Sequence, residues 1–254
     1  VDGGILFNNG GVLENIGTIE VTNPKYLPTS DIKQSIRGTN AKISVKNINA
    51  EGGEVYLYNN SQLSVINEIT ADSLVFANST LNANKGSVKI KSIELTEAQI
   101  SGSAQIESIS ISANHSSISA KKLTTDSLGL TKSSSINISG DLYVEDKTSM
   151  IDSNIIGAKQ FTSSNLEIRG NSSVIADSVI INSDLSVINT ESDSNPSLKT
   201  SSLSIGKITA NDDFSITMTG SDIAKIGEVY AKNGELELIG GVEPNKLTVA
   251  KEAT

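Results

Sequence analysis

A short phrase that returns at a nearly constant interval constrains this chain more than any other feature. Each copy places a large aliphatic residue after two small or polar residues, and the copies are Ser61-Gln62-Leu63, Ser79-Thr80-Leu81, Ala98-Gln99-Ile100, Ser116-Ser117-Ile118 and Ser134-Ser135-Ile136. The aliphatic positions are separated by 18, 19, 18 and 18 residues (81 − 63, 100 − 81, 118 − 100 and 136 − 118). A fixed period near 20 residues is typical of a repeat architecture, in which each repeat packs only on its neighbours.

Two longer repeats agree with this period. The segment 48–57 alternates aliphatic and polar residues around a Gly-Gly turn, and 229–238 follows the same pattern around Asn233-Gly234. The segment 118–124 reappears as 156–162 after 38 residues (156 − 118), or two repeats of 19, so we expect Ile118 and Ile156 to occupy equivalent positions. Period-2 alternation with β-branched residues and Gly, Asn or Ser turns predicts short strands that bury one face.

Strands this short cannot each bury an apolar face alone, but stacking equivalent strands in a winding chain solves the problem. Each coil would hydrogen-bond to the next at about 4.8 Å, and like residues would form columns along the axis. We expect one such column to contain the aliphatic residues of the repeated phrase, Leu63, Leu81, Ile100, Ile118 and Ile136. The predicted fold is all-β: a single right-handed parallel β-helix spanning residues 1–254, with three strands per coil and coils of about 18–21 residues. A β-sandwich and a left-handed hexapeptide helix are the alternatives.

Two segments interrupt the repeat pattern. Residues 23–40 contain Pro24 and Pro28, which cannot donate to a strand ladder, and residues 190–200 are too polar to be buried. We expect both to be loops that protrude from the coils.

Composition excludes several partners. The formal net charge is −9 and the only arginines are Arg37 and Arg169, so nucleic acid and anionic lipid surfaces, which reward clustered Lys and Arg, are not expected. No apolar run approaches the roughly 18 residues of a membrane span, so no membrane insertion by this segment is expected. The chain begins at Val1 without a charged and apolar leader, which suggests a processed or excised fragment.

Residues able to carry chemistry are few. His115 is the only histidine and cysteine is absent, so no His-based metal site or catalytic triad is expected. Asp72 and Asp126 share a phase of the coil, but three coils at about 4.8 Å would put them about 14 Å apart, too far for a glycosidase pair at about 5–9.5 Å. We interpret both, like Asp212-Asp213, as turn residues. Glu191, Asp193 and Asn195 could offer oxygens to calcium but lack the spacing of a known loop. We expect no catalytic residue, metal or cofactor.

The segments 48–57 and 229–238, and the opening 11–19, resemble the repeats of large secreted bacterial β-helix proteins. The nearest groups are the filamentous-haemagglutinin-like exoproteins of two-partner secretion and the passenger domains of autotransporter adhesins. The resemblance implies a secreted or outer-surface location on a Gram-negative bacterium, passage through an outer-membrane transporter, and a role in adhesion.

Three function hypotheses follow. The first is a non-enzymatic adhesin or structural rod that presents binding loops to a surface receptor or glycan, of the host or of other bacteria; the weak candidates for contact are Tyr26, Lys33 and Arg37 in the first loop. The second is a subunit that self-associates into a surface coat or filament through its terminal coils. The third is a polysaccharide-cleaving enzyme, which is disfavoured because Trp is absent and the five tyrosines appear scattered along the chain.

Overall fold

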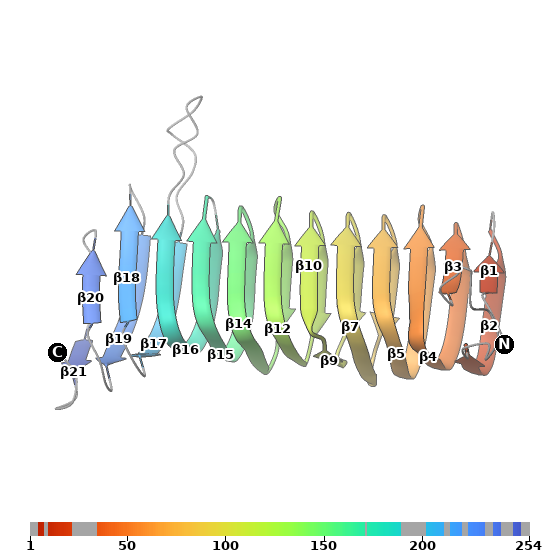
Figure 1. The fold of residues 1–254 in the computed structure, drawn as a ribbon, viewed down its shortest axis with the longest axis horizontal. Helices are drawn as coiled ribbons and strands as arrows, with labels where there is room; N and C mark the ends of the chain where they lie inside the picture. Colours follow the sequence, from red (N-terminus) through yellow and green to blue (C-terminus); the bar gives the residue numbers. More distant parts are fainter. Residues whose placement is uncertain are drawn as a thin grey trace, which may run out of the picture. The chain divides into compact units, whose positions relative to one another are not determined.

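A computed structural model gives the fold of this chain (Figure 1). It describes residues 5–7, 10–21, 35–170, 172–188, 202–210, 214–219, 223–231, 236–239 and 246–249. Every regular element among these residues is a β-strand, and the chain divides into two compact units, Val1–Leu123 and Thr124–Thr254. The expectation of one uninterrupted domain stays a prediction.

The strands of the first unit are β1 (Ile5–Phe7), β2 (Val12–Glu20), β3 (Ser35–Thr39), β4 (Lys42–Tyr58), β5 (Gln62–Ala77), β6 (Thr80–Ala83), β7 (Ser87–Thr96), β8 (Gln99–Gly102), β9 (Gln105–Glu107), β10 (Ser110–Asn114) and β11 (Ser117–Ala120). The unit boundary falls within β12 (Lys122–Thr131). The strands of the second unit after β12 are β13 (Ser135–Ile138), β14 (Asp141–Ile151), β15 (Asn154–Arg169), β16 (Ser173–Ile188), β17 (Ser202–Ala210), β18 (Phe214–Thr219), β19 (Ile223–Ala231), β20 (Leu236–Ile239) and β21 (Lys246–Val249).

Each coil of the first unit contributes three strand segments, which pair in parallel with their equivalents in the next coil. We call these faces 1, 2 and 3; in the coil that contains β5 they are residues 62–65, 68–71 and 73–77. Long strands such as β4 and β5 run through more than one face, with a shift of register at each bend. The prediction of a parallel β-helix with three strand segments per coil is confirmed; its handedness stays a prediction.

Like residues stack directly over one another in the first unit. On face 1 the paired positions run Leu13, Ile43, Leu63, Leu81, Ile100 and Ile118. On face 2 they run Ile19, Ile48, Ile69, Val88 and Ile106, and on face 3 Ile36, Val55, Leu74, Ile93 and Ile111. All of these side chains except the half-buried Leu13 are buried, so the three columns form the hydrophobic core. The predicted column from Leu63 to Ile118 is therefore confirmed.

The second unit is built in the same way. Its face 1 column begins with Ile136, Ile155 and Val174, and its face 2 column with Leu142, Phe161 and Val179. These six side chains are fully buried. Each of the two units is therefore a stack of parallel coils around an aliphatic interior.

One predicted equivalence is wrong by one residue. Ile136 pairs with Ile155, not with Ile156, and the Ile156 side chain is 41% exposed whereas that of Ile118 is 1% exposed. Gly157, at φ +82°, lies next to a register shift between Ile156 and Ala158. This bulge restores the match between the two segments, because Ala158 and Phe161 are buried like Ala120 and Leu123 at the corresponding positions.

A tight turn joins face 3 of one coil to face 1 of the next, and we call it the corner. A residue with positive φ occupies it in successive coils of the first unit: Gly10, Asn40, Asn60, Asn78, Glu97 and His115. Gly and Asn adopt this left-handed conformation at low cost, which explains their repetition here. His115, expected in a surface turn, is an exposed corner residue.

After each corner from Asn40 to His115, the next residue is a buried serine or alanine. Ser61 Oγ accepts a hydrogen bond from the Ala41 N–H (3.0 Å) and donates one to the Tyr58 carbonyl (2.6 Å), both in the preceding coil. Ser116 does the same for the Ala98 N–H (3.0 Å), and Ser172 for the Ser153 N–H (3.0 Å). Where the first position of the repeated phrase is serine, as at Ser61 and Ser116, its hydroxyl thus links neighbouring coils.

Two coils are much longer than the others. Leu13 and its partner Ile43 are 30 residues apart (43 − 13), and Val174 and Leu203 are 29 apart (203 − 174), whereas Leu63 and Leu81 are 18 apart. The two predicted interruptions therefore fall in coils with about ten extra residues. Residues 22–34 and 189–201 lie outside the described residues, so whether they protrude stays a prediction.

Replacement of Ser61 by alanine tests the corner. The substitution removes the acceptor for the buried Ala41 N–H, and an unsatisfied buried donor costs about 1–3 kcal/mol. We expect Ser61→Ala to lower the free energy of unfolding by about that amount in chemical denaturation. Ser64→Ala, on the outer side of the same coil, is the control and should change it by less than about 0.5 kcal/mol. Equal effects of the two substitutions would contradict the corner's role.

Candidate functional site

An aromatic and cationic cluster lies on the outer side of face 3 in the first unit. It consists of Arg37 on β3 and of Tyr56 and Tyr58 on β4, and we call it the Tyr–Arg cluster. Alternation along β4 creates it: Val55 and Leu57 point inward and are fully buried, so the tyrosines between and after them point outward. Coil stacking then pairs Arg37 with Tyr56 and Thr39 with Tyr58.

The three side chains contact one another. The Tyr56 and Tyr58 ring centroids are 6.1 Å apart with planes inclined by 21°, so the two rings are stacked. The Arg37 guanidinium carbon lies 5.2 Å from the centroid of the Tyr56 ring, within range of a cation–π interaction. Arg37 Nε also donates a hydrogen bond to Ser35 Oγ at 3.0 Å, which orients the guanidinium.

The backbone beneath the cluster allows close packing of β3 on β4. Gly38 lies between Arg37 and Thr39, and a Cβ atom there would come within 2.7 Å of Leu57 Cδ2 and 2.9 Å of Ala41 Cβ. Glycine at this position therefore leaves room for the buried Leu57 side chain directly below the outward-facing cluster.

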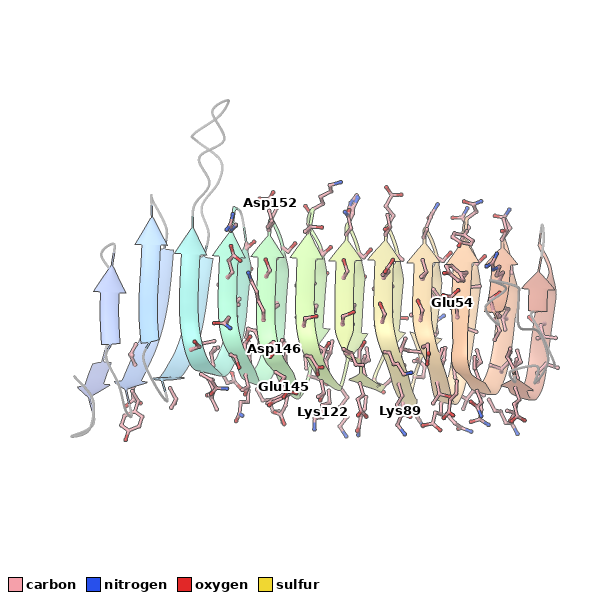
Figure 2. All side chains as sticks on the ribbon, in the orientation of Figure 1. Glu54, Lys89, Lys122, Glu145, Asp146 and Asp152 are labelled. Carbon is pink, nitrogen blue, oxygen red and sulfur yellow. The ribbon has the colours of Figure 1, made fainter. Side chains whose placement is uncertain are left out.

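A carboxylate and a partly desolvated hydroxyl accompany the cluster. Glu54, which is labelled in Figure 2, is mostly buried on the same strand. Its position pairs with Ser35 of β3. Burial raises the pKa of Tyr58 above its ordinary value; Glu54 adds to the rise and Arg37 opposes it. Tyr58 is therefore a neutral hydroxyl at physiological pH, able both to donate and to accept a hydrogen bond.

Short apolar side chains and several asparagines surround the tyrosines. On the next coil the positions paired with Tyr56 and Tyr58 are Val75 and Ala77, whose side chains are shorter than the rings. At the corner beside Tyr58, four exposed asparagines with positive φ gather on three consecutive coils: Asn40, Asn59, Asn60 and Asn78. The outward surface here thus combines aromatic rings, a guanidinium and several amide groups.

Of the three residues predicted to contact a partner, the structure places one. Arg37 is exposed but lies on β3, so the last part of the predicted loop 23–40 is a strand. Tyr26 and Lys33 lie outside the described residues. Tyr56 and Tyr58 were missed, and the interpretation of the tyrosines as scattered is wrong for this pair. The coil period could have predicted the contact between Arg37 and Tyr56, because these residues are 19 positions apart (56 − 37), about one coil.

The other residues singled out from the sequence do not form a second site among the described residues. Asp72 Oδ1 contacts Lys91 Nζ at 2.9 Å and accepts a hydrogen bond from the Gly52 N–H at 3.2 Å. The interpretation of Asp72 as a turn residue is wrong, because it lies within β5 and supports a bend of β4 in the neighbouring coil. Asp126 is half-buried on β12. Asp212, Asp213 and the acidic segment 191–195 lie outside the described residues. In the part of the chain that the structure describes, no group of three or more acidic, His or Cys side chains is arranged to hold a metal ion.

Surface charges elsewhere are paired between coils. Lys89 Nζ, which projects from the coils in Figure 2, contacts Glu68 Oε1 at 2.9 Å, and hydrogen bonds from Lys89 and Ser87 hold the pKa of Glu68 below its usual range. In the second unit Lys147 Nζ contacts Glu167 Oε2 at 2.7 Å. Hydrogen bonds from Lys147 and Arg169 lower the pKa of Glu167 in spite of its burial. Exposed pairs of this kind add little stability individually.

The fold defines the chain as an all-β protein of the parallel β-solenoid class. Comparisons with protein-family models, with curated proteins and with solved structures found no match to this chain. Among the described residues, no helix has the length and apolar character needed to span a membrane.

The raised pKa of Tyr58 leads to a test at alkaline pH. The folded state keeps the Tyr58 proton to a higher pH than the unfolded state, whose tyrosines ionise near pH 10. The contribution of Tyr58 to the free energy of unfolding is therefore constant below about pH 10 and is lost as the pH rises through the raised pKa. We expect Tyr58→Phe to reduce the alkaline loss of stability measured by denaturant unfolding at a series of pH values.

Tyr143→Phe, at an exposed tyrosine of the second unit, is the matched control and should leave the alkaline profile unchanged. The same alkaline profile in the wild type and in Tyr58→Phe would show that the Tyr58 hydroxyl is not desolvated by the cluster.

Proposed function

We propose that this chain is a non-enzymatic adhesin scaffold, exported to the outer surface of a Gram-negative bacterium, that presents binding elements on the outside of stacked β-coils. The partner is a receptor or glycan on a host or bacterial surface, and an outer-membrane transporter takes part in export. The observation that carries the proposal is the contrast between a strictly repeated interior and two coils lengthened by about ten residues each.

The inside and the outside of the coils tolerate sequence change to different degrees. An interior column accepts apolar residues that fit between the coils on either side, because a change of volume there disturbs the packing of both neighbours. Residues outside the coils are free of this constraint, and extra chain length between two paired strands costs little in loop-closure entropy. A β-solenoid can therefore carry varied recognition segments without loss of the fold.

The first insertion and the Tyr–Arg cluster are neighbours in the chain. Residues 22–34 lead directly into β3, which starts at Ser35 and carries Arg37 two residues later. The insertion and the cluster are therefore adjacent in the sequence, and the proposed partner engages both. The scaffold proposal accordingly locates its main recognition surface in the first unit.

Equal-length replacement of the insertions tests the proposal. Residues 23–33 and residues 190–200 are each replaced by a Gly-Ser sequence of the same length, which keeps the coil lengths. Circular dichroism and thermal melting should show retained β-structure, and attachment of protein-coated beads to cultured cells or extracellular matrix should fall for at least the first replacement. Unchanged attachment for both replacements would show that neither insertion contributes to binding, which would contradict the proposal.

Two further measurements separate the alternatives from the scaffold. Light scattering over a concentration series should show no growth in particle size, whereas a self-assembling coat subunit would grow. A reducing-sugar screen on polysaccharides should show no release of new ends, whereas a glycan-cleaving enzyme would release them.

A further inference from the structure

We infer that the Tyr–Arg cluster and the asparagines beside it form a binding site for a neutral glycan. The inference rests on the proposed function, because it names the partner class that the adhesin would recognise. Its basis is the combination of two half-buried, nearly parallel aromatic rings with exposed planar hydrogen-bonding groups around them.

The two rings supply the apolar part of sugar recognition. A pyranose ring has faces lined by C–H groups, and these pack against an aromatic surface wide enough to cover them. Tyr56 and Tyr58 together provide such a surface, with centroids 6.1 Å apart and nearly parallel planes. On the next coil, Val75 and Ala77 pair with Tyr56 and Tyr58, and their side chains are shorter than the tyrosine rings.

The polar groups supply orientation. Sugar hydroxyls are recognised by planar side chains that donate and accept in fixed directions, and Arg37 and the asparagine amides are of this kind. Asn59 and Asn60 follow directly after Tyr58, and Asn40 and Asn78 occupy the corners of the adjacent coils. All four amides are on exposed residues, so they can reach a ligand that lies on the rings.

The asparagines are not explained fully by the corner backbone. The same left-handed corner is occupied by Glu97 and His115 in the two coils that follow Asn78. Corner geometry therefore admits other side chains, although at a greater conformational cost. Asparagine is nevertheless found at each corner that flanks the tyrosine pair, which is where amide groups would contact a bound sugar.

Charge selects a neutral glycan over an acidic one. The single cation of the cluster, Arg37, already lies over the Tyr56 ring and donates Nε to Ser35. Glu54 lies on the same strand, and the whole chain carries a formal net charge of −9. A sulfated or sialylated chain would meet this negative field without a cluster of cations to offset it.

A printed array of neutral, sialylated and sulfated glycans tests the inference on the full chain. The strongest neutral oligosaccharide from the array is then titrated while the intrinsic tyrosine emission is recorded, which is direct here because the chain has no tryptophan. We expect binding to neutral glycans and a change in tyrosine emission on titration. Tyr56→Ala should weaken binding by roughly tenfold, equivalent to about 1.4 kcal/mol for a lost aromatic contact.

Matched variants separate recognition from folding. Asn60→Gly keeps the left-handed corner but removes the amide, and it should weaken binding several-fold without lowering the melting temperature. His115→Gly makes the same change at a corner away from the cluster and should leave binding unchanged. Tyr143→Ala removes an exposed tyrosine of the second unit and should also leave binding unchanged.

Absence of binding to every neutral glycan, binding only to acidic glycans, or wild-type affinity in both Tyr56→Ala and Asn60→Gly would overturn the inference. If bead attachment to cells is retained while no glycan binds, the glycan site fails and the adhesin proposal stands. If neutral glycans bind through Tyr56 but beads do not attach to cells, the glycan site stands and the adhesin proposal fails.

Discussion

Parallel hydrogen bonding between equivalent strands of successive coils is the interaction on which the rest of this structure depends. A coil segment of four or five residues has no partner for its backbone groups within itself, so the neighbouring coil must supply one. The paired positions match like with like, as in the column from Ile43 to Ile118 on face 1. Where the strand ladder stops at the corner, hydroxyls such as Ser61 continue the link between coils.

This constraint divides each coil into an inside and an outside with different freedom. Inside, an aliphatic side chain must fit between those above and below it, and its burial contributes about 1.5–3 kcal/mol. Outside, side chains need only tolerate solvent and their neighbours in the column. The proposed recognition surface consists of such outward positions, Arg37, Tyr56 and Tyr58. The alternate residues of β4, Val55 and Leu57, are ordinary core residues.

The sequence predicted the fold well because repetition and alternation report backbone pairing directly. Leu63, Leu81 and Ile100 are 18 and 19 residues apart, and they stack as that period requires. The period alone could not place Ile156, because a bulge at Gly157 changes the phase by one residue and leaves no mark in the spacing. The cluster could not be predicted from the period alone, because Arg37 lies on a strand and not in the expected loop, and contact between outward side chains depends on both the coil spacing and the strand parity.

Spin labelling of neighbouring coils tests the central claim most directly, because the chain has no cysteine and labels can be placed one by one. Nitroxides attached at Thr80→Cys and Gln99→Cys, paired positions on the outer side of face 1, should lie about 5 Å apart at the backbone and show strong spin exchange. A pair at Thr80→Cys and Glu107→Cys, on different faces, should not. The stacked-coil account predicts exchange broadening in the first pair alone; spectra of that pair equal to the sum of the two singly labelled proteins would contradict it.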